Sequence, residues 1–148
     1  IEQCVAYYRE VSEKLIEKHL KAYVGAKQLI IDLLEQGSHV GIVTSKMKHV
    51  AIQHMQKTAL YDERIFVVGY EDVKAHKPNP EGILKALDHF KVSALNQAIY
   101  VGDHENDIMA AKHAGIQSCG VTYSLRLKEV LEAGPHFVVD RLSEIKEI

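Results

Sequence analysis

The stretch Ile99-Tyr-Val-Gly-Asp-His-Glu-Asn-Asp107 decides how this chain folds. An apolar run ends there in Gly102 and Asp103, and a helical pattern follows, so we expect a buried strand that leads into a helix. Asp107 comes four residues after Asp103, which places both carboxylates on one side of the first helical turn. Two neighbouring acids suit a hard cation, with Mg²⁺ favoured, although acids at the start of a helix can also simply complement its dipole.

On both sides of this stretch, short apolar runs alternate with amphipathic helical segments. Strands are predicted at 39–43, 65–69, 98–102, 117–121 and 137–140, and helices at 26–36, 48–57, 80–90, 106–114 and 126–133. Five apolar strands separated by helices predict a doubly wound, Rossmann-like α/β fold with a parallel sheet that is covered on both faces. Ligands of such sheets bind outside the carboxyl ends of the strands.

The beginning of the chain follows a different pattern. An amphipathic helix of about 20 residues is predicted over 2–21. Since 148 residues suffice for one domain or part of a larger one, we expect the segment 1–22 to stand apart from an α/β unit over 23–148.

Composition excludes several classes of protein. The net charge of −2, without a basic block, argues against a nucleic-acid binder. No apolar run reaches the roughly 20 residues that a bilayer crossing requires. Cys4 and Cys119 form no CxxC pair, so neither a zinc site nor a disulfide framework is indicated. We therefore expect a cytoplasmic protein without a nucleic-acid or membrane partner.

Two further strand ends carry groups that suit an anion. Thr44 and Ser45 follow the strand at 39–43 and precede a helix, where hydroxyl and N–H groups can hold an anion or simply cap the helix. Lys77 precedes Pro78 in front of the helix at 80–90, so its backbone is held extended and its ammonium is presented on a stiff support. The plain alternative for Lys77 is a solvated surface lysine.

Taken in order, these hydroxyls, lysine and acids resemble the motifs of the haloacid dehalogenase (HAD) superfamily of phosphohydrolases, in its phosphoglycolate phosphatase and pyrophosphatase-like branch. Gly41-Ile-Val-Thr-Ser-Lys46 resembles the second motif of that family, Lys77-Pro78 the third, and Gly102-Asp-His-Glu-Asn-Asp107 the fourth. The resemblance covers nearly the whole chain. It implies a HAD-like core over 23–148, with 1–22 as the last helix of an α-helical cap.

The same resemblance implies roles for the site residues. Thr44 and Ser45 would bind the phosphoryl oxygens of a small phosphorylated metabolite, and Lys77 would neutralise charge on the phosphoryl group. Asp103 would ligate Mg²⁺, and Asp107 would be a second metal ligand or would orient the metal's water or Lys77. Thr44, Lys77 and Asp107 would form the catalytic set. The implied activity is Mg²⁺-dependent hydrolysis of a small phosphate ester, with phosphoglycolate, pyrophosphate and sugar phosphates all open.

One motif of the family is missing. Its members open with a strand that ends in Asp-x-Asp, the nucleophile and the general acid/base, and no such motif follows an apolar strand here. That strand would lie between those at 39–43 and 98–102, so we expect a strand-wide gap of about 10 Å between them. This predicts an inactive fragment of a longer enzyme, lacking its first strand, or a chain whose gap is filled by a rearranged strand pairing or by a strand from a partner chain.

Two alternatives remain open. A non-catalytic, HAD-like scaffold or phosphate-binding protein would use the same fold without turnover. A phosphoryl-accepting receiver domain also combines an acid cluster with a distal lysine, but its acids come early in the chain, whereas here they come late.

Overall fold

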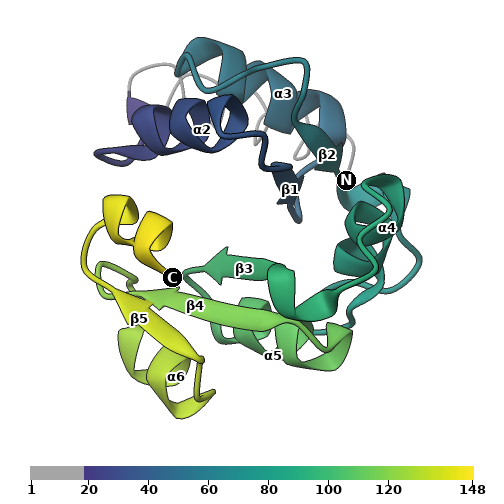
Figure 1. Ribbon diagram of the computed structural model, residues 1–148, viewed down its shortest axis with the longest axis vertical. Coiled ribbons are helices and arrows are strands. Elements are labelled where there is room, and N and C mark those ends of the chain that lie inside the picture. Colours follow the sequence, from purple (N-terminus) through teal and green to yellow (C-terminus); the bar gives the residue numbers. More distant parts are fainter. Residues whose placement is uncertain (1–18) are drawn as a thin grey trace, which may run out of the picture.

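The structure is a computed structural model that describes residues 19–148, in which parallel strands alternate with helices (Figure 1). The strands are β1 (Gly41–Val43), β2 (Phe66–Val68), β3 (Ile99–Gly102), β4 (Gln117–Val121) and β5 (Phe137–Val139). The helices are α2 (Ala26–Glu35), α3 (Lys48–Lys57), α4 (Glu81–His89), α5 (Glu105–Ala114) and α6 (Leu127–Glu132). Each strand and helix predicted in this part of the chain is present, with its ends shifted by at most two residues. Three short 3₁₀ helices, Tyr70–Asp72, Leu95–Gln97 and Leu142–Glu147, were not predicted.

The prediction for the beginning of the chain stays a prediction. The helix over 2–21, and with it the assignment of 1–22 to a cap, lies outside the described residues except for its last positions. Among residues 19–148, none of the helices combines the length and the apolar character that crossing a membrane requires.

Local sequence sets the ends of the helices. Gly37, one residue beyond the C-cap of α2, adopts a φ of 81°, and the next N–H, of Ser38, donates to the carbonyl of Leu33 at 2.9 Å. α4 begins at Glu81, whose N–H donates to Asn79 Oδ1 at 3.0 Å, as expected for a helix preceded by Asn-Pro. These turns fix the points at which the chain enters and leaves the strands.

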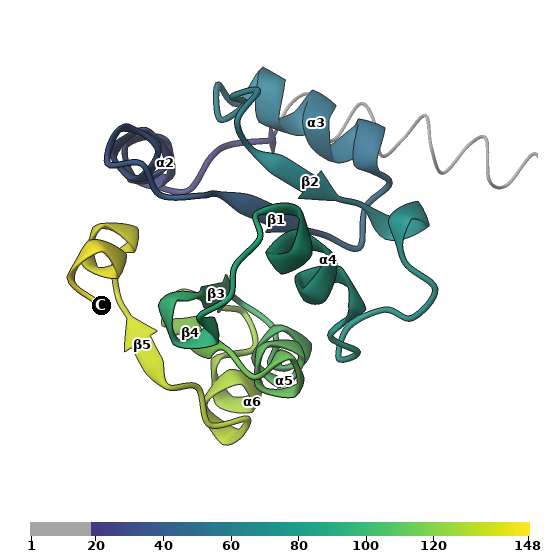
Figure 2. The same cartoon turned by 45° about the vertical axis from the view of Figure 1, so that its right-hand side comes forward.

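The five strands form two parallel sheets. β1 pairs with β2, with Val43 opposite Val68, and β3, β4 and β5 pair in that order. β1 and β3 do not pair with each other, which is where the sequence predicts the missing strand. The Val40 carbonyl and the Thr44 N–H bond to β2, so the backbone groups of Gly41 and Val43 point to the free edge of β1. Figure 2 shows the two sheets one above the other.

Helices on both faces hold the two sheets together without a shared strand. On one face, Leu33 of α2 packs against two clusters, one built on the β1–β2 sheet and one on the β3–β5 sheet. On the other face, α4 packs against α5. The apolar cluster between these two helices also includes Val43 of β1 and Tyr100 of β3. The spacing of β1 and β3 is therefore set by helix packing.

Leu33→Ala tests this bridging role. We expect the substitution to lower the free energy of unfolding by about 2 kcal/mol, because it removes contacts to both clusters. The matched control is Leu131→Ala on α6, where the side chain is 47% exposed and the change should stay within about 0.5 kcal/mol. Urea unfolding of both variants decides: equal losses would show that Leu33 does not tie the sheets together.

Candidate functional site

The loops that follow β1, β2 and β3 meet at the carboxyl ends of the strands. Lys77, on the loop after β2, reaches Asp107 in the first turn of α5, and Lys77 Nζ lies 2.6 Å from Asp107 Oδ1. Thr44, Ser45 and Lys77 line the same narrow hollow. The structure therefore brings together residues from all three motifs that the sequence singles out.

The Lys77 ammonium is fully hydrogen-bonded. Besides Asp107, it donates to the Val43 carbonyl and to the Tyr100 hydroxyl, each at 3.3 Å, so its three N–H groups have three acceptors. Burial alone would lower the pKa of Lys77, but the neighbouring Tyr100 and Asp107 side chains more than offset this and raise that pKa. Lys77 thus stands as a fixed positive charge, with its side chain 18% exposed, and not as a solvated surface lysine.

The Asp107 carboxylate is held in this contact with Lys77. It is buried, its Oδ1 accepts from Lys77, and its Oδ2 accepts from the N–H of His104 at 3.2 Å. Both carboxylate oxygens thus have partners within the protein. Of the roles that the sequence leaves open for Asp107, this geometry favours orienting Lys77; its role as a metal ligand stays a prediction.

Asp103 has the opposite environment. It is exposed, and within residues 19–148 its carboxylate makes no hydrogen bond or ion pair; only its backbone carbonyl is held, by the Ser124 hydroxyl at 2.5 Å. A free carboxylate at a strand end fits a hard cation, but Mg²⁺ requires six oxygen ligands. No group of three metal-binding side chains occurs in the described part of the chain, so Asp103 would supply one ligand among several.

Thr44 and Ser45 do not cap the following helix. α3 begins at Lys48 with Met47 at its N-cap, and the N–H of Lys48 donates to the Glu71 carboxylate at 3.1 Å, not to Thr44 or Ser45. Thr44 Oγ1 accepts from the N–H of Lys46 at 3.1 Å, which leaves the hydroxyl hydrogen free to donate. Of the two interpretations of this hydroxyl pair, helix capping is therefore wrong, and anion binding stays a prediction.

Sequence reasoning missed several residues that shape the site. Tyr100 contacts Lys77 across the two sheets, and a tyrosine in an otherwise apolar strand was the available signal. After β4, Ser124 donates to the Asp103 carbonyl, and Arg126 bonds Glu105 at the start of α5. Arg126 forms two hydrogen bonds with the Glu105 carboxylate, at 2.7 and 2.8 Å, and these lower the pKa of Glu105 to about 2. No pattern in the sequence predicts this pairing.

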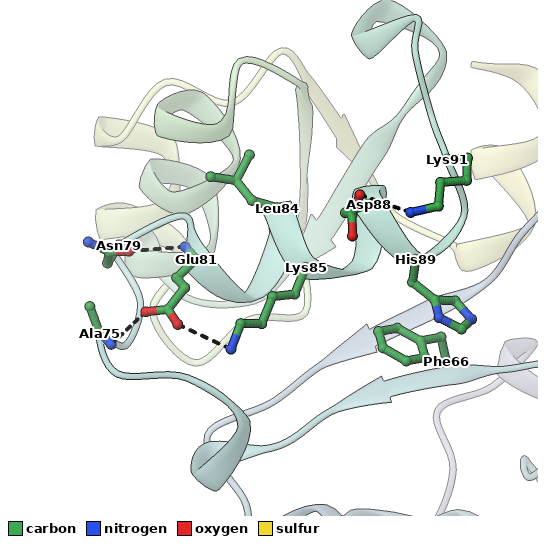
Figure 3. A pocket seen from close by; sticks show the side chains of 9 residues that line it. All are labelled: Phe66, Ala75, Asn79, Glu81, Leu84, Lys85, Asp88, His89 and Lys91. Carbon is green, nitrogen blue, oxygen red and sulfur yellow. Dashed lines mark hydrogen bonds and ion pairs between the residues drawn. The ribbon is translucent and has the colours of Figure 1, made fainter.

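A larger hollow lies outside this constellation (Figure 3). It has a volume of about 860 Å³, and Phe66 stacks on His89 in its wall with 3.7 Å between ring centroids. Its charged side chains are paired with one another, Glu81 with Lys85 and Asp88 with Lys91. None of the site residues predicted from the sequence lines it.

Comparison with known proteins agrees with this geometry. The model of the haloacid dehalogenase-like hydrolase family matches residues 1–121. The chain belongs to this family. Among its relatives is the proposed pyrophosphatase PpaX of Clostridium perfringens, 32% identical over 149 aligned positions that cover the whole chain and 69% of the relative. The pyrophosphatase PpaX of Bacillus cereus is 30% identical, over the whole chain and 68% of its own length.

Solved structures of other proteins share the fold. A proposed β-phosphoglucomutase from Thermotoga maritima superposes with a TM-score of 0.87 at 26% identity, over 99% of this chain and 70% of its own. A hydrolase from Pseudomonas syringae gives a TM-score of 0.83 at 24% identity, over 99% and 68%. This chain therefore spans about two thirds of the length of its HAD-like relatives.

Gly102→Ala tests how tightly Asp107 is placed. A Cβ at Gly102 would lie 2.6 Å from both Cγ and Oδ2 of Asp107, so the carboxylate would have to move. We expect a loss of about 1–3 kcal/mol in the free energy of unfolding, as for an overpacked core position. The control is Gly41→Ala in β1, where the nearest atoms are 3.5 Å away and the change should be close to neutral. Urea unfolding measures both, and a neutral Gly102→Ala would contradict this close approach.

The pKa of Glu105 gives a second test. Because Arg126 lowers it to about 2 from an ordinary value of 4.5, the pair stabilises the fold above pH 4.5 and loses this contribution as the pH falls towards 2. In Arg126→Gln the pKa should return towards 4.5, while Arg141→Gln, which removes the partner of Glu144, should leave it unchanged. Carboxyl ¹³C NMR titration measures each variant; titration of Glu105 near 4.5 in the unchanged chain would rule the pair out.

Proposed function

We propose that this chain is the greater part of a Mg²⁺-dependent phosphohydrolase that acts on a small phosphate ester. The observation that carries the proposal is the Lys77 ammonium, held by Asp107 beside Thr44 and Ser45 at the carboxyl ends of the strands. Phosphoryl transfer depends mainly on positioning the phosphoryl group and on stabilising its negative charge. A fixed ammonium flanked by hydroxyl and N–H donors meets that requirement.

Each side chain takes one part of this task. The Thr44 hydroxyl and the Ser45 N–H donate to phosphoryl oxygens, and Lys77 adds a positive charge to them. Asp107 holds Lys77 in place and keeps it charged. Asp103 offers its free carboxylate to Mg²⁺, which supplies charge neutralisation and orientation of the phosphoryl group when bound.

The nucleophile would come from a strand between β1 and β3 that lies outside these 148 residues. Two features support this position: β1 and β3 do not pair, and both backbone groups of Gly41 and the N–H of Val43 point to the free edge, whereas the Val43 carbonyl accepts from Lys77 and Tyr100. Such a strand would complete a continuous parallel sheet and carry its terminal acid to the same edge as Lys77 and Asp103. By this proposal the 148 residues alone are inactive.

A non-catalytic HAD-like scaffold that binds a phosphate ligand is the second candidate. The observation that favours it is the set of acids at the described strand ends: Asp107 is bonded through both oxygens, and Asp103 is the proposed metal ligand. Among the described residues, no carboxylate lines the hollow that Thr44, Ser45 and Lys77 share. The scaffold would bind phosphate through Thr44, Ser45 and Lys77 without turnover.

The finer parts of the proposal concern substrate and setting. We propose a small phosphorylated metabolite, first of all phosphoglycolate, as the substrate. Pyrophosphate is the alternative substrate, because curated relatives are named pyrophosphatases. The cytoplasm is the proposed location. Where the further strand is lacking, the unpaired edges of β1 and β3 favour self-association of the 148 residues, so a homo-oligomer is part of the proposal.

The test uses the complete product of the gene that encodes this chain. We expect Mg²⁺-dependent release of phosphate from phosphoglycolate or pyrophosphate, and a loss of at least about 100-fold in kcat for Asp103→Asn, because the free carboxylate disappears. The control is Asp88→Asn, in the hollow of Figure 3, which should keep full activity. An inactive complete product that still binds phosphate would favour the scaffold, and full activity of Asp103→Asn would exclude the metal role.

A further inference from the structure

The Lys77 ammonium has a second neighbour besides Asp107 whose role the proposed function does not use. Tyr100, on β3, is largely buried, and its hydroxyl lies 3.3 Å from Lys77 Nζ. The same hydroxyl donates to the Val43 carbonyl at 2.9 Å. Burial raises the pKa of Tyr100 despite the nearby Lys77, so the phenol keeps the proton that this bond requires. Tyr100 therefore accepts from the lysine on one side and bonds β1 on the other.

The backbone beside Lys77 has an anchor of its own. His113, near the end of α5, places its Nδ1 2.9 Å from the carbonyl of Pro78. α5 also carries Asp107, so one helix holds both the ammonium of Lys77 and the peptide that follows it. The Lys77–Pro78 segment is thus hydrogen-bonded to α5 and to β3.

We propose that Tyr100 and His113 are positioning residues for Lys77, Tyr100 through the ammonium and His113 through the Pro78 carbonyl. The proposal rests on the role of Lys77 in the proposed function. Neither side chain needs to touch the substrate; each acts through Lys77.

The hydrogen bonds indicate how Lys77, positioned by Tyr100 and His113, can still bind a phosphoryl oxygen. All three N–H groups of Lys77 are in use, so a phosphoryl oxygen can bind only in exchange for one acceptor. The bond to Asp107 is the shortest at 2.6 Å and joins opposite charges, so the 3.3 Å contacts to Val43 and Tyr100 are the ones to give way. Because the Tyr100 hydroxyl bonds the Val43 carbonyl by itself, that carbonyl keeps a partner when Lys77 turns away.

The experiment observes the ammonium directly in the 148-residue chain. A ¹H–¹⁵N spectrum of lysine NH₃⁺ groups, recorded cold and near pH 6, should show a sharp Lys77 signal because hydrogen bonds slow its exchange with water. Lys77→Gln assigns the signal by removing it. In Tyr100→Phe the signal should broaden or exchange at least about fivefold faster. Tyr123→Phe, at a tyrosine whose ring lies 4.8 Å from that of Tyr23 between centroids, should leave it unchanged.

His113 provides a second, milder test, since its side chain is exposed and its loss is not expected to unfold the chain. His113→Ala should broaden the Lys77 signal and shift the Lys77 backbone amide, and His113→Asn should restore both because its side-chain N–H can reach the Pro78 carbonyl. The proposal would be overturned if the unchanged chain gave no Lys77 signal. It would also be overturned if the signals in Tyr100→Phe and His113→Ala did not differ from that of the unchanged chain. Since this readout needs no turnover, an inactive complete product would count against the proposed function alone.

Discussion

A buried ammonium and a buried carboxylate must stay together, and in this fold they come from different halves of the molecule. Lys77 belongs to the loop after β2, and Asp107 to the helix that follows β3 in the other sheet. Separating them would leave a charge without a partner in a poorly solvated place, which is strongly destabilising. The pair therefore joins the two sheets at the point where their carboxyl ends meet. Gly102 is part of the same constraint, because the Asp107 carboxylate lies where a Cβ would be.

Helix packing makes this charged contact possible in spite of the break between β1 and β3. α2 lies across both sheets on one face, and α4 packs against α5 on the other, so the two edges are held facing each other. Sheet edges normally attract a further strand because their N–H and C=O groups lack partners. Here the Val43 carbonyl accepts from Tyr100 and Lys77, so side chains take the place of a strand at the end of β1 that lies next to the site.

The sequence predicted what depends on local pattern, and it missed what depends on contacts between distant segments. Apolar runs and helical periodicity located the strands and helices, and the rule about strand ends placed the three motifs at one edge. The break in the sheet was predicted through the family resemblance, because nothing in the runs themselves indicates which strands pair. Thr44 was compatible with helix capping until the start of α3 was known. The contact of His113 with Pro78 joins residues 35 positions apart, and no spacing rule reaches that far.

Asp103 and Asp107 show how environment separates two residues of one type in one motif. A single ammonium can neutralise one of the two carboxylates, and the geometry gives Lys77 to Asp107, which is buried on α5 and also accepts from the N–H of His104. Asp103, on the strand end, keeps its negative charge facing solvent. Two acids placed close together repel unless a cation offsets each of them. Since the lysine already offsets one, the cation of the proposed function would be drawn to the other, and the proposed division of roles follows from which carboxylate is buried.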